Sequence, residues 1–165
     1  MTSKADFTDE EWTRIRRAPF VAGMAISLAD PGGPIEVAKE TMASLRSASV
    51  PPSEEELLLL ISRDIQELIQ KKQNPMGDFK PRNAALAGQQ VIDELRAVNE
   101  IVTAKATPEE AAAFRRWLVN TAQAAADAAK EGGFMGFGAE QVSKGEKEML
   151  NQLEKALGAQ PDRPR

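Results

Sequence analysis

Four pairs of side chains, each three residues apart, predict helix starts in this sequence. In each pair a serine or threonine precedes a glutamate, and the two side chains can satisfy each other's free backbone N–H groups in the first turn of a helix. The four pairs are Thr8/Glu11, Ser53/Glu56, Thr107/Glu110 and Ser143/Glu146. Pro108 follows the third pair, at a position where a missing N–H has no cost. These signals recur along the whole chain and favour a helical protein.

Between these starts, apolar residues recur three or four positions apart, which is the spacing of one helix face. No segment alternates apolar and polar residues as a half-buried strand does. Pro19 is predicted to separate a short first helix around Trp12 from an apolar second helix over 20–29. The later helices are expected over 35–45, 53–72, 84–102, 108–130 and 143–157. The predicted fold class is all-α, a compact bundle of about seven helices.

The length of the chain, 165 residues, is enough to bury a core as one domain. We expect this domain to cover residues 1–158, because Gly158 suits the C-terminal end of the last helix. Residues 159–165 contain two prolines and are expected to form a flexible C-terminal tail.

The composition restricts the chemistry, because the chain contains no histidine, cysteine or tyrosine. Histidine is the commonest general base and transition-metal ligand, and cysteine supplies thiolate nucleophiles and zinc ligands. No Gly-x-Ser-x-Gly motif is present to expose a serine nucleophile. We therefore expect no catalytic residues and no enzyme, although acid–base chemistry by Asp, Glu or Lys stays open.

The charge balance and hydropathy bear on the environment of the protein. The chain has 21 basic and 25 acidic side chains, a formal charge of −4, which argues against general nucleic-acid binding. Its longest apolar run, Leu57 to Ile61, is far shorter than the roughly 20 residues that cross a bilayer. No apolar signal-peptide core follows Met1, and the lack of cysteine fits a reducing compartment. We expect a cytoplasmic protein without a transmembrane segment.

Two stretches share one architecture, in which an apolar helix runs into a glycine-rich turn and then into a helix with glutamates near its start. In the first, the helix over 20–29 is followed by Asp30-Pro-Gly-Gly-Pro34. In the second, the helix over 117–129 is followed by Lys130-Glu-Gly-Gly133. This repetition favours two pseudo-symmetric helical hairpins, although any helical bundle contains such hairpins.

The motifs at these turns resemble those of the tellurite-resistance TerB-like family. Ala29-Asp30-Pro-Gly-Gly-Pro-Ile35 followed by Glu40 is similar to the family's helix–Ala-Asp-Gly-x-Ile-x-x-x-Glu–helix signature. Val142-Ser143-x-x-Glu146 is similar to its Gly-x-Val-Ser-x-x-Glu pattern. The resemblance implies a seven-helix, pseudo-symmetric bacterial domain associated with stress response, and in some members metal binding by turn carboxylates. The two prolines and the longer second turn depart from the family pattern and bear on metal binding more than on the fold.

A candidate metal site is formed by Asp30, Glu36 and Glu40. Glu36 and Glu40 are four residues apart and share a helix face. Together with Asp30 they offer the oxygen ligands that Ca²⁺ or Mg²⁺ prefers. The alternative is structural, because acidic residues near a helix start also interact favourably with its dipole. No other cofactor is predicted.

A candidate partner-binding site lies in the glycine-rich segment 132–138, which carries Phe134, Met135 and Phe137. The segment is not a phosphate-binding loop, because no Lys-Ser/Thr follows its last glycine. Its large apolar side chains either fold back to close one end of the core or remain exposed to bind a protein partner, a second copy or a membrane surface.

Two further segments carry less specific signals. The turn-rich segment 74–82 contains Phe79, which is predicted to lie in a structured connection, with partner contact as the alternative. Arginines near the start of the first and the sixth predicted helix either pair with the many glutamates or bind a phosphate or acidic partner. These residues are Arg14, Arg16, Arg17, Arg115 and Arg116.

These observations predict a non-catalytic helical interaction or scaffold protein that binds a protein partner or itself. Two alternatives stay open. One is Ca²⁺ or Mg²⁺ binding by the turn carboxylates, and the other is an apolar ligand pocket between the helices. The side chains expected to line that pocket are Met24, Met42, Phe114 and Trp117.

Overall fold

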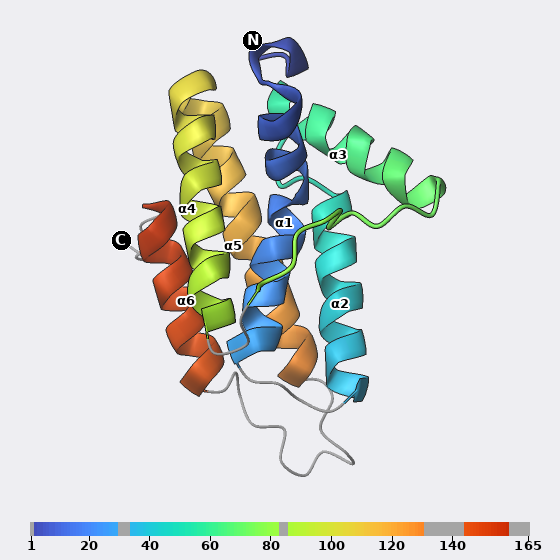
Figure 1. Cartoon of the computed structure of the whole chain (residues 1–165), viewed down its shortest axis with the longest axis vertical. Helices are drawn as coiled ribbons and strands as arrows, with labels where there is room; N and C mark the ends of the chain where they lie inside the picture. The colour runs from blue at the N-terminus through green and yellow to red at the C-terminus, as the bar shows by residue number, and fades with distance from the viewer. Residues whose placement is uncertain (1, 30–33, 83–85, 131–143, 159–165) are drawn as a thin grey trace.

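The computed structural model describes residues 2–29, 34–82, 86–130 and 144–158, with the backbone alone at 34–38 and 129–130. These ranges contain one short 3₁₀-helix, six α-helices and no strand (Figure 1). The elements are η1 (Lys4–Asp6), α1 (Asp9–Ala29), α2 (Pro34–Ser49), α3 (Glu56–Gln70), α4 (Ala87–Lys105), α5 (Pro108–Lys130) and α6 (Lys144–Leu157). The predicted all-α class is confirmed.

The predicted break at Pro19 is wrong, because Pro19 lies inside the continuous helix α1. A proline inside a helix removes one backbone hydrogen bond and crowds the preceding turn. Buried apolar side chains nevertheless continue on both sides of it, from Trp12 and Ile15 to Val21 and Ile26. Packing of this single stripe outweighs the local penalty, and the two helices expected here are one.

Helix α1 is the centre of the bundle and contacts all five of the other α-helices described. Figure 1 shows α2, α4, α5 and α6 running alongside α1, whereas α3 leaves the bundle at an angle. Helix α5 packs against both α1 and α2, and its buried side chains include several alanines. The buried alanines of α5 are Ala111, Ala113, Ala122, Ala125 and Ala126.

The predicted helix starts are confirmed in two cases. The backbone N–H of Thr8 donates to Glu11 Oε2 at 2.8 Å, and that of Glu11 donates to Thr8 Oγ1 at 3.1 Å. Thr107 and Glu110 make the same reciprocal pair at 3.0 and 3.2 Å. Ser143 lies outside the described residues. At the other end of α6, Gly158 has the positive φ of 63° that ends a helix, as predicted.

The predicted start at Ser53 is wrong. Helix α3 begins at Glu56 with Glu55 in the N-cap position, and the Ser53 hydroxyl is buried without a hydrogen-bond partner in the described part of the chain. Glu55 has a ψ of 135°, which is not helical, so the backbone becomes regular only after it. The chain therefore enters α3 later than the Ser53/Glu56 pattern predicts.

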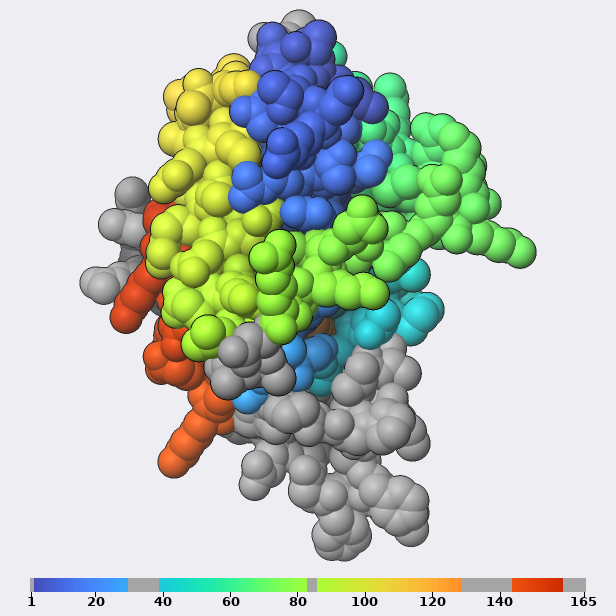
Figure 2. Space-filling model, in the orientation of Figure 1, coloured from blue at the N-terminus to red at the C-terminus, as the bar shows by residue number. Residues whose placement is uncertain are grey.

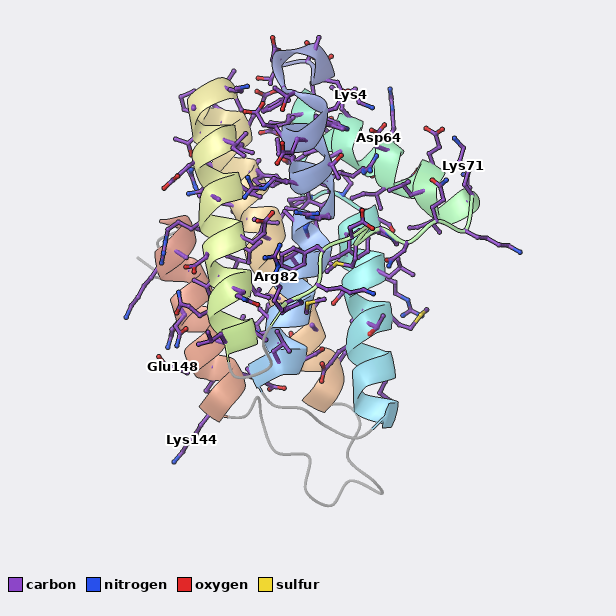
Figure 3. All side chains as sticks on the ribbon, in the orientation of Figure 1. Lys4, Asp64, Lys71, Arg82, Lys144 and Glu148 are labelled. Atoms are coloured by element: carbon purple, nitrogen blue, oxygen red, sulfur yellow. The ribbon has the colours of Figure 1, made fainter. Side chains whose placement is uncertain are left out.

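Two tryptophans connect helices through their indole N–H groups. Trp12 Nε1 on α1 donates to Asp64 Oδ2 on α3 at 2.7 Å. Lys4 Nζ donates to the same oxygen at 2.8 Å, and Figure 3 labels Lys4 and Asp64. Trp117 Nε1 on α5 donates to the carbonyl of Ser47 on α2 at 2.8 Å. None of the helices in the described ranges is both long and apolar enough to span a membrane.

Candidate functional site

Two adjoining hollows lie on the side of the bundle where α1 faces α4. One, of about 570 Å³, is lined by Asp9, Glu10, Thr13, Arg14, Arg17 and Glu94. The other, of about 320 Å³, is lined by Arg17, Asp78, Phe79, Lys80, Pro81, Arg82 and Gln90. Arg17 lines both hollows, and we call the two together the Arg17 groove.

The residues that line the groove include an ion-pair cluster between α1 and α4. Arg14 holds Glu94 with two hydrogen bonds, from Nε to Oε1 at 3.0 Å and from Nη2 to Oε2 at 2.9 Å. Arg17 Nη2 adds a third, to Oε1 at 3.1 Å. Bidentate pairing of Arg14 with Glu94 restricts both side chains to one geometry. Burial raises the pKa of Glu94, but the hydrogen bonds and charges of Arg14 and Arg17 outweigh burial and hold this pKa below its ordinary value.

One wall of the groove is the segment 74–82, which connects α3 to α4 after crossing α1. Figure 2 shows the segment in green on the surface between α2 and α4, with α1 visible above and below it. Phe79 is partly buried against the core, and the guanidinium of Arg17 lies 5.0 Å from the centre of its ring. The segment is thus a structured connection, as predicted, and Phe79 belongs to the wall of the groove.

Local hydrogen bonds hold this wall in one conformation. The Asn74 carbonyl accepts the N–H of Gly77 at 3.1 Å, and the Asn74 side chain accepts the N–H of Met76 at 3.0 Å. Gly77 has a φ of 57°, the left-handed conformation that glycine adopts at little cost. At the far end, the backbone N–H of Arg82 donates to Gln90 Oε1 of α4 at 2.8 Å. A turn therefore orders the first part of the wall, and one hydrogen bond joins its last residue to α4.

The second hollow has an excess of positive charge, with Arg17, Lys80 and Arg82 set against Asp78. Lys80 and Arg82 are exposed, and neither takes part in the ion pairs among the described residues. Arg17 Nε is buried and has no hydrogen-bond partner in the described ranges. Lys80 and Arg82 are therefore cationic groups of this hollow that no ion pair among the described residues neutralises.

The predicted metal site is described only in part. Glu40 on α2 is 1% exposed, and its Oε2 accepts a hydrogen bond from the Ser27 hydroxyl of α1. Asp30 lies outside the described residues, and so does the side chain of Glu36. Within the described ranges, no three acidic side chains gather in a way that would hold a metal ion. Binding of Ca²⁺ or Mg²⁺ by this set stays a prediction.

The predicted glycine-rich site cannot be placed. Phe134, Met135 and Phe137 all lie outside the described residues. Whether these side chains close the core or remain exposed to a partner therefore stays open.

The predicted arginine cluster does not form a single patch. Arg14 and Arg17 face Glu94 on α4, whereas the charge of Arg16 acts on Asp64 of α3 and helps to lower its pKa. Arg115 Nη1 on α5 donates to Thr103 Oγ1 of α4 at 3.4 Å. Pairing with carboxylates accounts for Arg14 and Arg17, as one of the two interpretations predicts.

The side chains expected to line an apolar pocket have different surroundings. Phe114 and Trp117 are fully buried in the core, whereas Met42 on α2 is 50% exposed. Met24 on α1 is partly buried against the core.

Sequence reasoning missed Glu94 and Gln90, the two residues of α4 that complete the groove. Their spacing of four places both on one helix face, and Arg14 and Arg17 share a face of α1 in the same way. The charge pattern was therefore visible in the sequence. The pairing was not, because it joins residues about 80 positions apart and depends on how α1 and α4 pack.

Comparison of the chain with protein-family models, with curated proteins and with solved structures gives no match.

Proposed function

We propose that this protein is a non-catalytic interaction domain that binds a protein partner in the Arg17 groove. The observation that carries the proposal is the wall formed by residues 74–82. A hydrogen-bonded turn orders its first part, a hydrogen bond to Gln90 of α4 holds its last residue, and it presents Phe79, Lys80 and Arg82 beside a hollow. A wall ordered in advance lowers the entropy lost on binding, which favours recognition of a partner.

The composition of the groove supports binding rather than catalysis. Among the described carboxylates of the groove, Glu94 is engaged by two arginines that hold it in the charged form. A general base needs a pKa near the working pH, and the pKa of Glu94 is shifted away from it. Arginine and aromatic side chains are enriched at protein interfaces.

Other parts of the prediction from sequence remain proposals that rest on motifs. The glycine-rich segment around Phe134 and Phe137 is a second candidate contact, for a partner or for another copy of the chain. The TerB-like resemblance suggests pseudo-symmetric hairpins, which would correspond to α1–α2 and α5–α6, and a role in bacterial stress response. Each of these pairs of helices is in contact.

Photo-crosslinking in the cells that produce the protein tests the proposed function. A photo-reactive amino acid is placed at Lys80 in the groove and, as a matched control, at Lys71 at the tip of α3, which Figure 3 shows far from Arg82. We expect a discrete crosslinked protein from the Lys80 position and none from Lys71. No crosslink from Lys80, or the same set of crosslinks from both positions, would contradict the proposal.

A further inference from the structure

We infer that the partner segment recognised by the Arg17 groove is an acidic peptide whose carboxylates enter the second hollow. This inference rests on the proposed function and adds the chemistry of the partner. It starts from a local reversal of charge. The chain as a whole carries −4, yet the side chains around this hollow include three cations and one carboxylate.

The three cations are available in different ways. Lys80 and Arg82 are exposed and form no ion pair with other described residues. Arg17 is paired with Glu94 through Nη2, and its Nε is buried, so this residue adds positive charge to the hollow rather than a free donor. A peptide carboxylate in the hollow would pair with Lys80 and Arg82. Pairing with arginine and lysine through charge-assisted hydrogen bonds is the strongest polar contact that such a ligand can make.

The apolar part of the hollow favours a peptide over a bare anion. Phe79 and Pro81 line it, and the Phe79 ring is kept in place by the core on one side and by Arg17 at 5.0 Å. The methylene groups of a glutamate side chain can pack on such a surface while the carboxylate reaches the cations. A hollow of about 320 Å³ is at the small end of ligand-binding sites and suits one or two side chains.

The surroundings argue against nucleic acid as the ligand. Asp9, Glu10 and Asp78 flank the cations within the two hollows. Binding of a continuous phosphate backbone needs several cations along a track, and the negative groups at the mouth would repel it. A short acidic peptide whose carboxylates enter only the second hollow meets a single carboxylate there, Asp78, and leaves Asp9 and Glu10 in the first hollow uncontacted.

The test measures binding of a fluorescein-labelled hexaglutamate peptide to the whole chain by fluorescence anisotropy. The variant Lys80→Glu/Arg82→Glu reverses two charges of the hollow, and Lys144→Glu/Lys147→Glu makes the same change at exposed positions on α6, where Figure 3 labels Lys144. We expect the groove variant to lose affinity by about tenfold or more and the α6 variant to change by less than about twofold. Circular dichroism checks that both variants remain folded.

A rescue arm separates specific pairing from a general charge effect. The groove variant should bind a labelled hexa-arginine peptide more tightly than the α6 variant does. An equal loss of hexaglutamate binding in both variants, or no loss in either, would overturn the inference. So would an oligonucleotide of the same charge that binds the native groove more tightly than the peptide. If a Lys80 crosslink to a protein persists in any of these cases, the proposed function stands and only the acidic partner is wrong.

Discussion

At the scale of single residues, α1 and α2 approach each other closely at Gly23. A methyl group added there would lie 2.2 Å from Ser44 Oγ and 2.7 Å from Ser44 Cβ. The Ser44 hydroxyl is itself held by a 2.8 Å hydrogen bond to the carbonyl of Glu40. The missing side chain at Gly23 therefore sets the distance between the two helices.

We predict that Gly23→Ala destabilises the protein, although alanine is the better helix former by about 1 kcal/mol. The overlap with Ser44 involves the Cβ atom and cannot be relieved by rotation of the hydroxyl alone. The expected loss in the free energy of unfolding is about 1–3 kcal/mol, measured by urea denaturation.

Gly88 on α4 provides the matched control. A methyl group there would meet only the end of the flexible Met149 side chain, at 3.3 Å. Gly88→Ala should therefore be neutral or stabilise by up to about 1 kcal/mol. Equal changes in unfolding free energy for the two substitutions would show that α1 and α2 are not in close contact at Gly23.

At the scale of elements, the ion pairs of Glu94 join α1 to α4, and the stability that they contribute should depend on pH. The pKa of Glu94 lies below its ordinary value of 4.5 in the folded chain, so the unfolded chain binds more protons at acidic pH. Stability is therefore present above the ordinary pKa and is lost as pH falls through and below it. Asp64 and Glu110 have lowered pKa values as well and contribute in the same direction.

We predict that Glu94→Gln lowers the stability at neutral pH and flattens its dependence on pH. The amide keeps the shape but loses the charge that Arg14 and Arg17 stabilise. The difference in unfolding free energy between native protein and variant should shrink as pH falls from about 5 to about 3. Glu67→Gln, at an exposed pair with Lys71, should leave the native pH curve unchanged. Parallel curves for native protein and Glu94→Gln would refute the argument.

Helix positions could be predicted from the sequence wherever the signals are local. The Thr8 and Thr107 starts, the end at Gly158 and the long α5 all follow from residues close together in the chain. The break at Pro19 could not be predicted correctly, because packing on both sides of it decides the outcome. The groove could not be predicted from the sequence either, because Arg17, Phe79 and Glu94 come into contact only through the packing of the bundle.

At the scale of the whole molecule, one cooperative domain is expected, because a single buried cluster includes side chains from α1, α3, α4, α5 and α6, and α2 packs against α1, α3 and α5. The two tryptophans report on different parts of it. Trp12 lies where α1 meets α3, and Trp117 lies between α5 and α2.

We predict that the two regions unfold together. In Trp12→Phe the emission comes from Trp117 alone, and in Trp117→Phe it comes from Trp12 alone, since the chain has two tryptophans and no tyrosine. Within each variant, the fluorescence midpoint in urea should coincide with the midpoint from far-ultraviolet circular dichroism. Separated midpoints in either variant would indicate two independently unfolding parts.

The central place of α1 has a consequence for synthesis on the ribosome. This helix leaves the exit tunnel before every other α-helix described, yet its apolar stripe is covered on different sides by α2, α4, α5 and α6. Until the last of these has emerged, part of the stripe stays in water, where it is open to aggregation. We therefore expect the nascent chain to be most prone to aggregation before α6 has left the tunnel.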